Sequence, residues 1–276
     1  MVCYNVVCVG CGGTGTYFIK EFVRFMASYR NPNCKISLSI IDADIVEAKN
    51  LERQCFIDDD IGKCKALVMA EVIKAAFDLL RIYAYPIYID EKSQLEKIFN
   101  DMHDEARDSR HYSNNTHIDI LIGAVDNHRA RQVMECYFRK RRSIIYFDAA
   151  NEFSNGEVVF GGKHEGRIMG QSRAYYYPGI MKSRSKRASE ISCGAINKSD
   201  PQHMLTNMMA ANLLLAKVIP MISGTPIVFG IAYFDAFESF SKFNAYEMKG
   251  GCLDAGRNTK KAVNPKKDQE AAKAAG

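Results

Sequence analysis

The feature that most constrains the fold is a short stretch in which an apolar run breaks on glycines and then resumes with a helical pattern. It reads VVCVGCGGTGTYF, from Val6 to Phe18, and its glycines at positions 10, 12 and 15 match G-x-G-x-x-G. A strand over 6–9 followed by a helix would turn backbone N–H groups and the positive end of the helix dipole toward a phosphate. The stretch predicts a nucleotide-binding loop, although a strand–helix turn without a ligand has the same spacing.

The hydrophobic pattern alternates between strand-like and helix-like segments. We expect strands at 35–44, 81–89, 118–127 and 143–150, and helices at 14–29, 62–77, 91–102 and after 128. This alternation predicts βαβ units and a parallel sheet with right-handed crossovers. Beyond residue 150 the pattern indicates an antiparallel strand, a helix over 201–218 and a hairpin over 225–248. The expected fold is α/β, a Rossmann-like doubly wound sheet continued by antiparallel strands, with an exposed polar loop over 103–117.

Composition and length bound the organisation of the chain. With 276 residues, 47% hydrophobic and 25% charged, the chain is typical of a globular protein. We expect a nucleotide-binding half over 1–150, a C-terminal half over 151–254 and a disordered tail over 255–276. Neither a signal peptide nor an apolar stretch of about 18 residues is evident, so we expect a cytoplasmic protein with no membrane association.

The net charge and the cysteines argue against a nucleic-acid-binding protein, a disulfide-rich protein and a zinc protein. The tail carries +4 of the total charge of +5, so nucleic acid binding is expected at most weakly and through that tail. Nine cysteines in a chain of this size do not indicate a disulfide scaffold. The only C-x-x-C spacing, Cys8 and Cys11, lies in the glycine loop, so we expect no structural zinc and interpret both as packing residues.

Residues behind the second strand bear on which nucleotide binds. Asp42 suits the ribose hydroxyls of either NAD or ATP. Asn50, Arg53 and Lys65 follow closely, and two cations with an amide donor suit a triphosphate. Taken singly, Arg53 and Lys65 are equally compatible with a solvated surface. The alternative, an NAD(P)-dependent oxidoreductase, leaves the pair of cations without a role.

These segments together resemble a known family. The motifs GCGGTG, DADIVEAKNLERQ, GKCKA and GAVDNHRAR, spread over 6 to about 150, resemble the E1-like (ubiquitin-activating-type) adenylyltransferases, which include ThiF, MoeB and HesA. A finer resemblance is to the stand-alone ThiF-family proteins of bacterial gene clusters that also encode a ubiquitin-like protein and a JAB-type peptidase.

The resemblance implies a reaction and a site. Such enzymes use ATP with Mg²⁺ to adenylate the C-terminal carboxylate of a ubiquitin-like protein that ends in glycine, and a homodimer is the family expectation. By motif position Asp42 holds the ribose, the three residues Asn50, Arg53 and Lys65 hold the phosphates, and Asp126 binds Mg²⁺. The implied nucleotide-binding residues are Gly10, Gly12, Gly13, Gly15, Asp42, Asn50, Arg53, Lys65, Asp126 and Asn127. Without the family, Asp126-Asn127 reads as a helix cap. Arg131 is read as structural.

Three departures from the family pattern bear on catalysis. Lys49 stands where the family has a small hydroxyl residue, the paired zinc-binding C-x-x-C motifs are missing, and the first strand begins almost at Met1. We therefore expect no N-terminal helix carrying the arginine that reaches a partner subunit. This absence motivates a further alternative, a catalytically reduced scaffold that binds a ubiquitin-like protein.

A second chemical step would need a nucleophilic cysteine. Many family members pass the acyl group to a cysteine before a crossover helix, and Cys193 occupies that position, with Cys252 as second candidate. Nearby basic residues would favour the thiolate: Lys182, Arg184, Lys186 and Arg187. The candidate catalytic residues are Arg53, Lys65, Asp126 and Cys193. The segment 205–216 reads as a core or dimer-interface helix, and the aromatic residues of the hairpin as a docking surface: Phe234, Phe237, Phe240, Phe243 and Tyr246.

Overall fold

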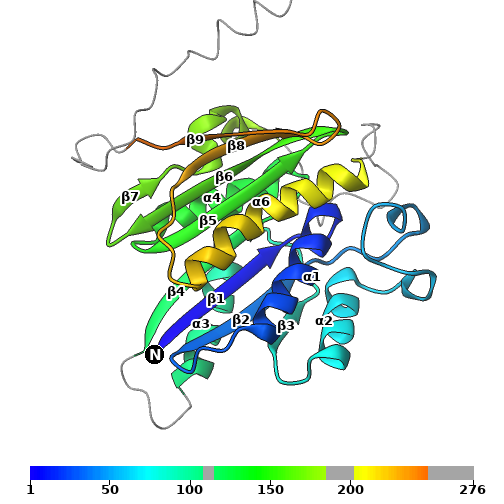
Figure 1. Ribbon diagram of the computed structural model, residues 1–276, viewed down its shortest axis with the longest axis horizontal. Helices are drawn as coiled ribbons and strands as arrows, with labels where there is room; N and C mark the ends of the chain where they lie inside the picture. The colour runs from blue at the N-terminus through cyan, green and yellow to red at the C-terminus, as the bar shows by residue number, and fades with distance from the viewer. Residues whose placement is uncertain (108–114, 185–201, 248–276) are drawn as a thin grey trace, which may run out of the picture. The chain divides into compact units, whose positions relative to one another are not determined.

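A nine-stranded sheet organises the chain in the computed structural model, which describes residues 1–107, 115–184 and 202–247 (Figure 1). Five strands are parallel: β1 (Val2–Val9), β2 (Cys34–Ile41), β3 (Arg81–Tyr85), β4 (Thr116–Gly123) and β5 (Ile144–Asn151). Antiparallel strands continue it: β6 (Asn155–His164), β7 (Arg167–Gly170), β8 (Gly230–Asp235) and β9 (Phe240–Ala245). The expected doubly wound sheet with an antiparallel continuation is confirmed.

The strand order reverses direction next to β1, which creates a topological switch point at the carboxyl edge of the sheet. The order is β3-β2-β1-β4-β5-β6-β8-β9, with β7 paired to β6. From β1 the chain first builds outward to β2 and β3, then returns to place β4 on the other side of β1. Ligands of open α/β sheets bind at the carboxyl ends of the strands where the direction reverses. This point lies between β1 and β4.

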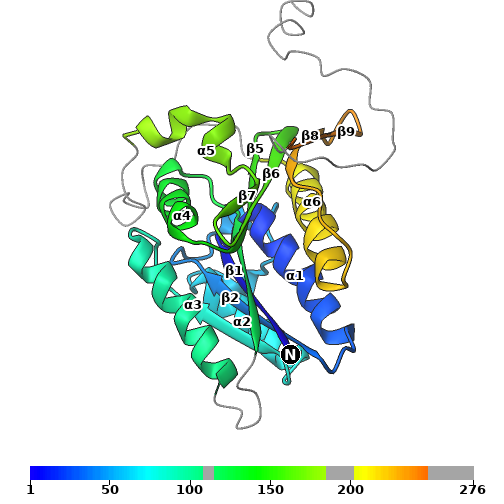
Figure 2. The same ribbon diagram turned by 90° about the vertical axis from the view of Figure 1, so that its left-hand side faces the viewer.

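Helices cover both faces of the sheet. α1 (Gly13–Ser28), α2 (Lys65–Ala76) and α6 (Met204–Ile222) share one hydrophobic core, and α3 (Lys92–Arg107) and α4 (His128–Lys140) share the other (Figure 2). Shorter turns are α5 (Arg173–Tyr176) and the 3-10 turns η1 (Ala48–Asn50), η2 (Asp58–Asp60) and η3 (Pro178–Lys182). Residues Met1–Tyr246 form one compact unit.

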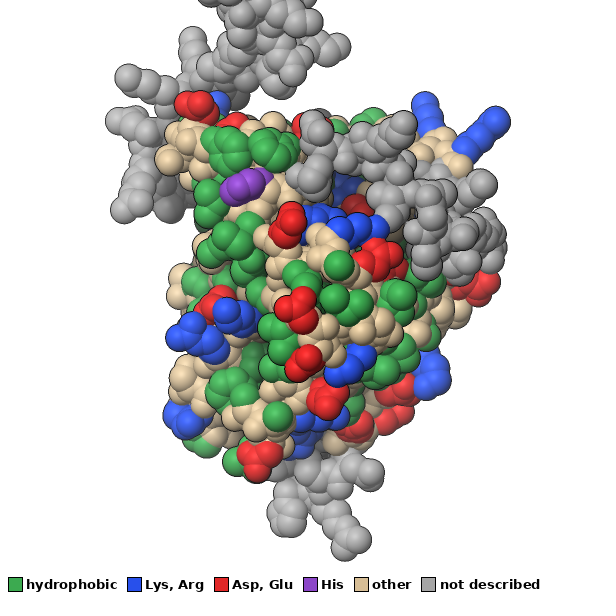
Figure 3. Space-filling model, turned by 90° about the vertical axis from the view of Figure 1, so that its right-hand side faces the viewer, with side chains coloured by type: hydrophobic (Ala, Val, Ile, Leu, Met, Phe, Trp, Pro, Cys, Tyr) green, Lys and Arg blue, Asp and Glu red, His purple; other side chains and the backbone are tan. Residues whose placement is uncertain are grey.

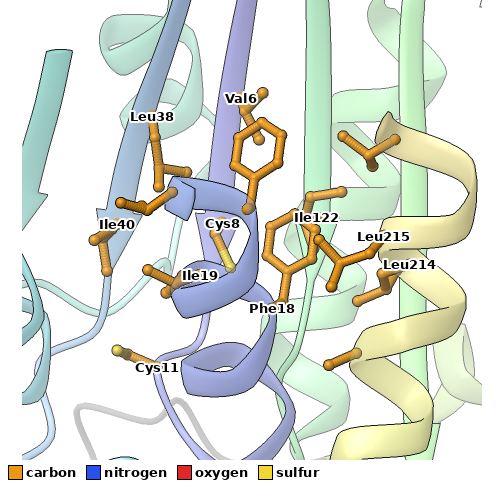
Figure 4. Close-up of a cluster of buried hydrophobic side chains, with 14 of the residues drawn as sticks. Val6, Cys8, Cys11, Phe18, Ile19, Leu38, Ile40, Ile122, Leu214 and Leu215 are labelled. Carbon is orange, nitrogen blue, oxygen red and sulfur yellow. The ribbon is translucent and has the colours of Figure 1, made fainter. Parts of the chain in front are cut away.

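Alternation along β1 assigns its side chains to the two cores. Val6 and Cys8 pack under α1, whereas Val7 and Val9 face α3 and α4, as the period of two in a strand requires. Figure 4 shows Cys8 and Cys11 among the aliphatic and aromatic side chains between α1 and the sheet. Both thiols are fully buried, and burial raises the pKa of each, so they stay protonated. Their interpretation as packing residues is confirmed.

Two expected boundaries were wrong. Helix α3 runs to Arg107 and β4 begins at Thr116, so both ends of the polar stretch 103–117 that we expected to be a loop lie in regular structure. The cause is a tertiary contact, since His103 Nε2 lies 2.7 Å from Asp119 Oδ1. The last helix also passes the expected end at 218 and continues to Ile222 through Pro220.

The apolar character of α6 exceeds the sequence expectation. By length and composition it is the one helix among the described residues that would suffice to cross a membrane, which corrects the expectation that no such stretch exists. Core helices meet the same criterion, and α6 packs against α1, β5 and β6. Its composition therefore follows from its place in the core.

Candidate functional site

The glycine loop is held by close backbone contacts at two of its glycines. Gly10 has φ +98°, and a Cβ there would lie 2.4 Å from the carbonyl oxygen of Ala124, just after β4. A Cβ on Gly15 would lie 2.1 Å from the carbonyl oxygen of Gly10. Both positions require glycine because the loop, the start of α1 and the end of β4 touch through their main chains.

Gly12 differs, because space beside it is open. It is the N-cap of α1 without a capping side chain, and the nearest atom to a Cβ there would be Gln54 Nε2 at 3.9 Å. The first-turn N–H groups of a helix have no partner within the helix. This open space at the start of a sixteen-residue helix fits an anionic group such as a phosphate.

Asp42 lies beside the loop at the end of β2. Its carboxylate accepts hydrogen bonds from the backbone N–H groups of Cys11 at 2.6 Å and Asp44 at 2.8 Å. Burial, with a smaller contribution from the charge of Asp44, raises the pKa of Asp42 to about 6. The carboxylate is therefore ionised at neutral pH and fixed against the loop.

Lys65 begins α2 and is nearly buried. Its ammonium lies 3.3 Å from Asp44 Oδ2, and the hydroxyl of Tyr88 donates to Asp44 Oδ1 at 2.7 Å. The main chain joins the same residues, since the Lys65 N–H donates to the carbonyl of Asp44. Contact of Lys65 with a phosphate would exchange or share this ion pair. Asp44 was missed as a site residue, although the doublet DAD signals it.

Asn50 and Arg53 have different environments. Asn50 is buried, and its Oδ1 accepts the N–H of Glu47 at 2.9 Å, so its carboxamide closes the turn at η1. Lys49 in this turn pairs with Glu47. Arg53 is half-buried, and its guanidinium makes no hydrogen bond or ion pair with any residue that the structure describes. Asn50 is uncharged and its Oδ1 is used by the turn, so Arg53 is the residue of the two that offers a charge to a ligand.

The turn after β4 carries two neighbouring polar residues with different environments, Asp126 and Asn127. Asn127 caps α4 by accepting the N–H of Ala130 at 2.7 Å. Asp126 is exposed and has no ion pair or hydrogen bond within the described ranges. Arg131 donates to the carbonyls of Val125 and Ala149, which braces this turn against β5 and fits the structural interpretation of Arg131.

A second charged cluster, centred on Asp148 of β5, was not anticipated. Asp148 is buried, pairs with Arg131 at 3.3 Å and Arg173 at 3.0 Å, and accepts from the hydroxyl of Tyr146 at 2.7 Å. Arg173 is also bonded to Glu157. Because these charges come from separate strands and helices, no sequence motif marks them.

The thioester candidates and two of the nearby basic residues fall in segments that the structure does not describe. Cys193, Cys252, Lys186 and Arg187 lie outside the described residues. Lys182 and Arg184 lie on and after η3, which Gln132 of α4 anchors through bonds to the carbonyls of Ile180 and Ser183.

The aromatic residues of the hairpin divide between core and surface. Phe234 is buried, whereas Phe237 and Phe240 are about half exposed. Phe237 packs edge-to-face on Phe153, which follows β5, and on His203, the N-cap of α6. This aromatic cluster (Phe153, His203 and Phe237) lies at the same edge of the sheet as the glycine loop, because β5, β8 and α6 meet there.

Other surface charges give no competing site on the face shown in Figure 3. Acidic and basic side chains are interspersed there with hydrophobic ones, so this face carries no patch of a single sign. Within the described ranges, no group of three or more His, Cys, Asp or Glu side chains is arranged to hold a metal ion.

A family profile matches the sequence that contains the glycine loop, Asp42 and the turn after β4. The ThiF family profile matches residues 3–259, nearly the whole chain. The chain belongs to the ThiF family.

Curated relatives of this ThiF-family chain carry E1-like names. It is 31% identical over 157 residues to a sulfur carrier protein adenylyltransferase of Thermus thermophilus, covering 56% of this chain and 49% of that protein. It is 26% identical over 132 residues to the ubiquitin-like modifier-activating enzyme 5 of Oryza sativa, covering 48% of this chain and 28% of that protein. The chain therefore spans half or less of these relatives' lengths.

Solved structures show the same fold at lower identity. E. coli MccB, crystallised with ATP, has a TM-score of 0.60 at 19% identity, covering 91% of this chain and 66% of that one. PaaA has a TM-score of 0.55 at 18% identity, covering 87% and 63% respectively. These likenesses confirm the ThiF-type fold.

Proposed function

We propose that this ThiF-family protein is an E1-like adenylyltransferase that uses ATP to activate the C-terminal carboxylate of a ubiquitin-like protein. The observation that carries the proposal is a pair of unpaired charged side chains at the switch point between β1 and β4. The side chains of Arg53 and Asp126, of opposite charge, have no partner among the described residues. Each is next in the chain to a residue that lies beside the glycine loop: Gln54 beside Gly12, and Val125 beside Gly10. The names of the curated relatives support the same reaction class.

The chemistry assigns a task to each element. The first turn of α1 and Arg53 would bind the triphosphate, and Asp42 would accept the ribose hydroxyls. The partner's carboxylate attacks the α-phosphorus, the bond to the β-phosphate oxygen breaks, and pyrophosphate leaves with an acyl-adenylate remaining. Fixed cations stabilise the charge that develops on the leaving pyrophosphate.

Asp126 is the residue that would hold Mg²⁺. An exposed carboxylate with no protein partner fits this ion, which keeps several waters and is bound by one or two carboxylates with substrate phosphates. When bound, Mg²⁺ would neutralise phosphate charge. We expect no zinc site.

The partner and the later steps complete the proposal. The aromatic cluster beside the site would dock an apolar surface of the ubiquitin-like protein, so that its C-terminus reaches the nucleotide. A thioester would follow when the Cys193 thiolate attacks the acyl carbonyl and AMP leaves, with Cys252 as the second candidate. We also propose a cytoplasmic homodimer without membrane association.

The deciding experiment is ATP–pyrophosphate exchange with a ubiquitin-like protein ending in Gly-Gly. We expect exchange that depends on the partner and is lost in Asp126→Ala. Absence of exchange with every such partner, together with intact partner binding, would instead favour the scaffold alternative. Normal affinity for NADH without ATP binding would favour the oxidoreductase. A DTT-sensitive adduct lost in Cys193→Ser but retained in Cys252→Ser would identify the thioester residue.

A further inference from the structure

A carboxamide side chain deep in the molecule connects three elements around the glycine loop. Asn207 lies in the first turn of α6 and is fully buried, in a helix whose other buried side chains are mostly apolar. A buried polar group without a partner is destabilising, so its partners explain its presence. They come from far along the chain.

The partners of Asn207 belong to a loop, a strand and a helix. Its Nδ2 donates to the carbonyl oxygen of Arg53 at 3.4 Å, and its Oδ1 accepts from Asn151 Nδ2 at 2.8 Å. The hydroxyl of Thr14 lies 3.4 Å from the same Oδ1 and 3.2 Å from Asn151 Oδ1, and donates to one of them at a time. The short bond to Asn151 anchors the carboxamide, and the long bond reaches Arg53.

The carboxamide also presses against the glycine loop. A Cβ on Gly13 would lie 2.2 Å from Asn207 Nδ2 and 2.4 Å from its Cγ. Gly13 is therefore glycine because α6 occupies the space beside it, and its own φ is not positive. The start of α1, where a phosphate would bind, thus rests directly on Asn207.

Arg53 depends on its main chain for its placement. Its N–H donates to the carbonyl of Asn50 at 3.1 Å, its carbonyl accepts from Asn207, and its guanidinium has no partner within the described residues. A flexible side chain without contacts is positioned by the backbone that carries it. Asn207 contacts both the Arg53 carbonyl and Gly13, so it links the main chain of Arg53 to the start of α1.

We propose that Asn207 is a positioning residue of the nucleotide site: its carboxamide holds the main chain of Arg53 against the start of α1, and so aims the guanidinium at the triphosphate. The inference rests on the proposed function, since it assumes that ATP binds at this helix terminus. Its specific content is that Asn207 acts on ATP through Arg53.

The test is a double-mutant cycle measured as ATP and adenosine affinity by calorimetry on the full chain. Asn207→Leu, which keeps the branched shape of the side chain and removes its hydrogen bonds, is expected to weaken ATP binding at least fivefold and adenosine binding less than twofold. In an Arg53→Ala background, the same substitution should change ATP affinity less than twofold, because the group that it positions is gone. Asn207→Ser provides a second variant, whose smaller side chain does not clash with Gly13.

The control and the contrary outcomes separate this inference from the proposed function. Val218→Ala, on the same helix about 16 Å further along its axis, removes buried volume and should lower the melting temperature without changing the ratio of ATP to adenosine affinity. Equal losses for Asn207→Leu with and without Arg53 would overturn the positioning role. No ATP binding by the wild-type protein would overturn the proposed function itself.

Discussion

Two groups of charged residues at the carboxyl side of the sheet differ in how completely their charges are paired. Around Asp148, the buried carboxylate is ion-paired with the buried guanidinium groups of both Arg131 and Arg173. Around the glycine loop, Arg53 and Asp126 are accessible and lack partners in the described part of the chain. The comparison indicates that pairing and burial, more than residue type, separate a stabilising cluster from one that is available to a ligand.

The largest expected effect is on stability, at the closed cluster. Asp148→Ala should lower the free energy of unfolding by about 3–5 kcal/mol, because the buried Arg131 loses its carboxylate partner and the buried Arg173 keeps only Glu157. Urea denaturation measures this change. Asp126→Ala, the matched removal of an exposed carboxylate, should stay within about 0.5 kcal/mol of wild type. Equal losses for the two variants would break the comparison.

The second effect is on activity, at the open cluster. Arg53→Ala should lower the rate of partner-dependent ATP–pyrophosphate exchange about 100-fold, the scale of losing one group that stabilises transition-state charge. Its unfolding free energy should change by less than about 0.5 kcal/mol. Arg24→Ala, an exposed arginine on α1, is the control and should leave exchange unchanged. Exchange that survives in Arg53→Ala would remove that residue from the site.

A smaller effect concerns pH and the Asp42 carboxyl, whose pKa is raised to about 6. Below pH 6 the carboxyl gains a proton and is a poorer acceptor for ribose hydroxyls, so ATP affinity should fall by up to about tenfold per pH unit. The free energy of unfolding depends on pH in the opposite direction, because between pH 3.8 and about 6 the folded protein holds this proton and the unfolded chain does not. This group therefore makes stability decrease as pH rises through that window. Asp42→Asn should flatten both profiles, and an unchanged affinity profile would contradict the assignment.

The smallest effect tests the aromatic cluster. Phe237→Ala should raise the KM for the ubiquitin-like partner about fivefold, near 1 kcal/mol for one exposed aromatic contact, with no change in the KM for ATP. Leu79→Ala is the control, because Leu79 is 91% exposed and follows α2, away from the cluster. A change in the KM for ATP, or none for the partner, would count against docking at this surface.

The sequence predicted the sheet and its glycine loop because both depend on local patterns. Alternating apolar segments and the glycine spacing specify strand, turn and helix without knowledge of the rest of the chain. It did not predict the continuation of α3 to Arg107, which depends on the contact between His103 and Asp119. Asn207 was missed because it lies 154 residues from Arg53, and its helix reads as an apolar core element. Pairing across such distances has no signature in one sequence.

The contact between Asn207 and Gly13 has a consequence for how this fold can be divided. Every described residue proposed to touch the nucleotide lies before residue 150, which suggests a module that can be excised or transplanted. Yet α6 packs beside α1 on the same face of the sheet, and the helix terminus proposed to receive phosphate rests on a side chain from the second half. A fragment ending at residue 150 would keep the signature motifs and lose α6, the helix that packs against the start of α1. The two helices are therefore one structural unit, and a nucleotide-binding fragment of this chain would need both.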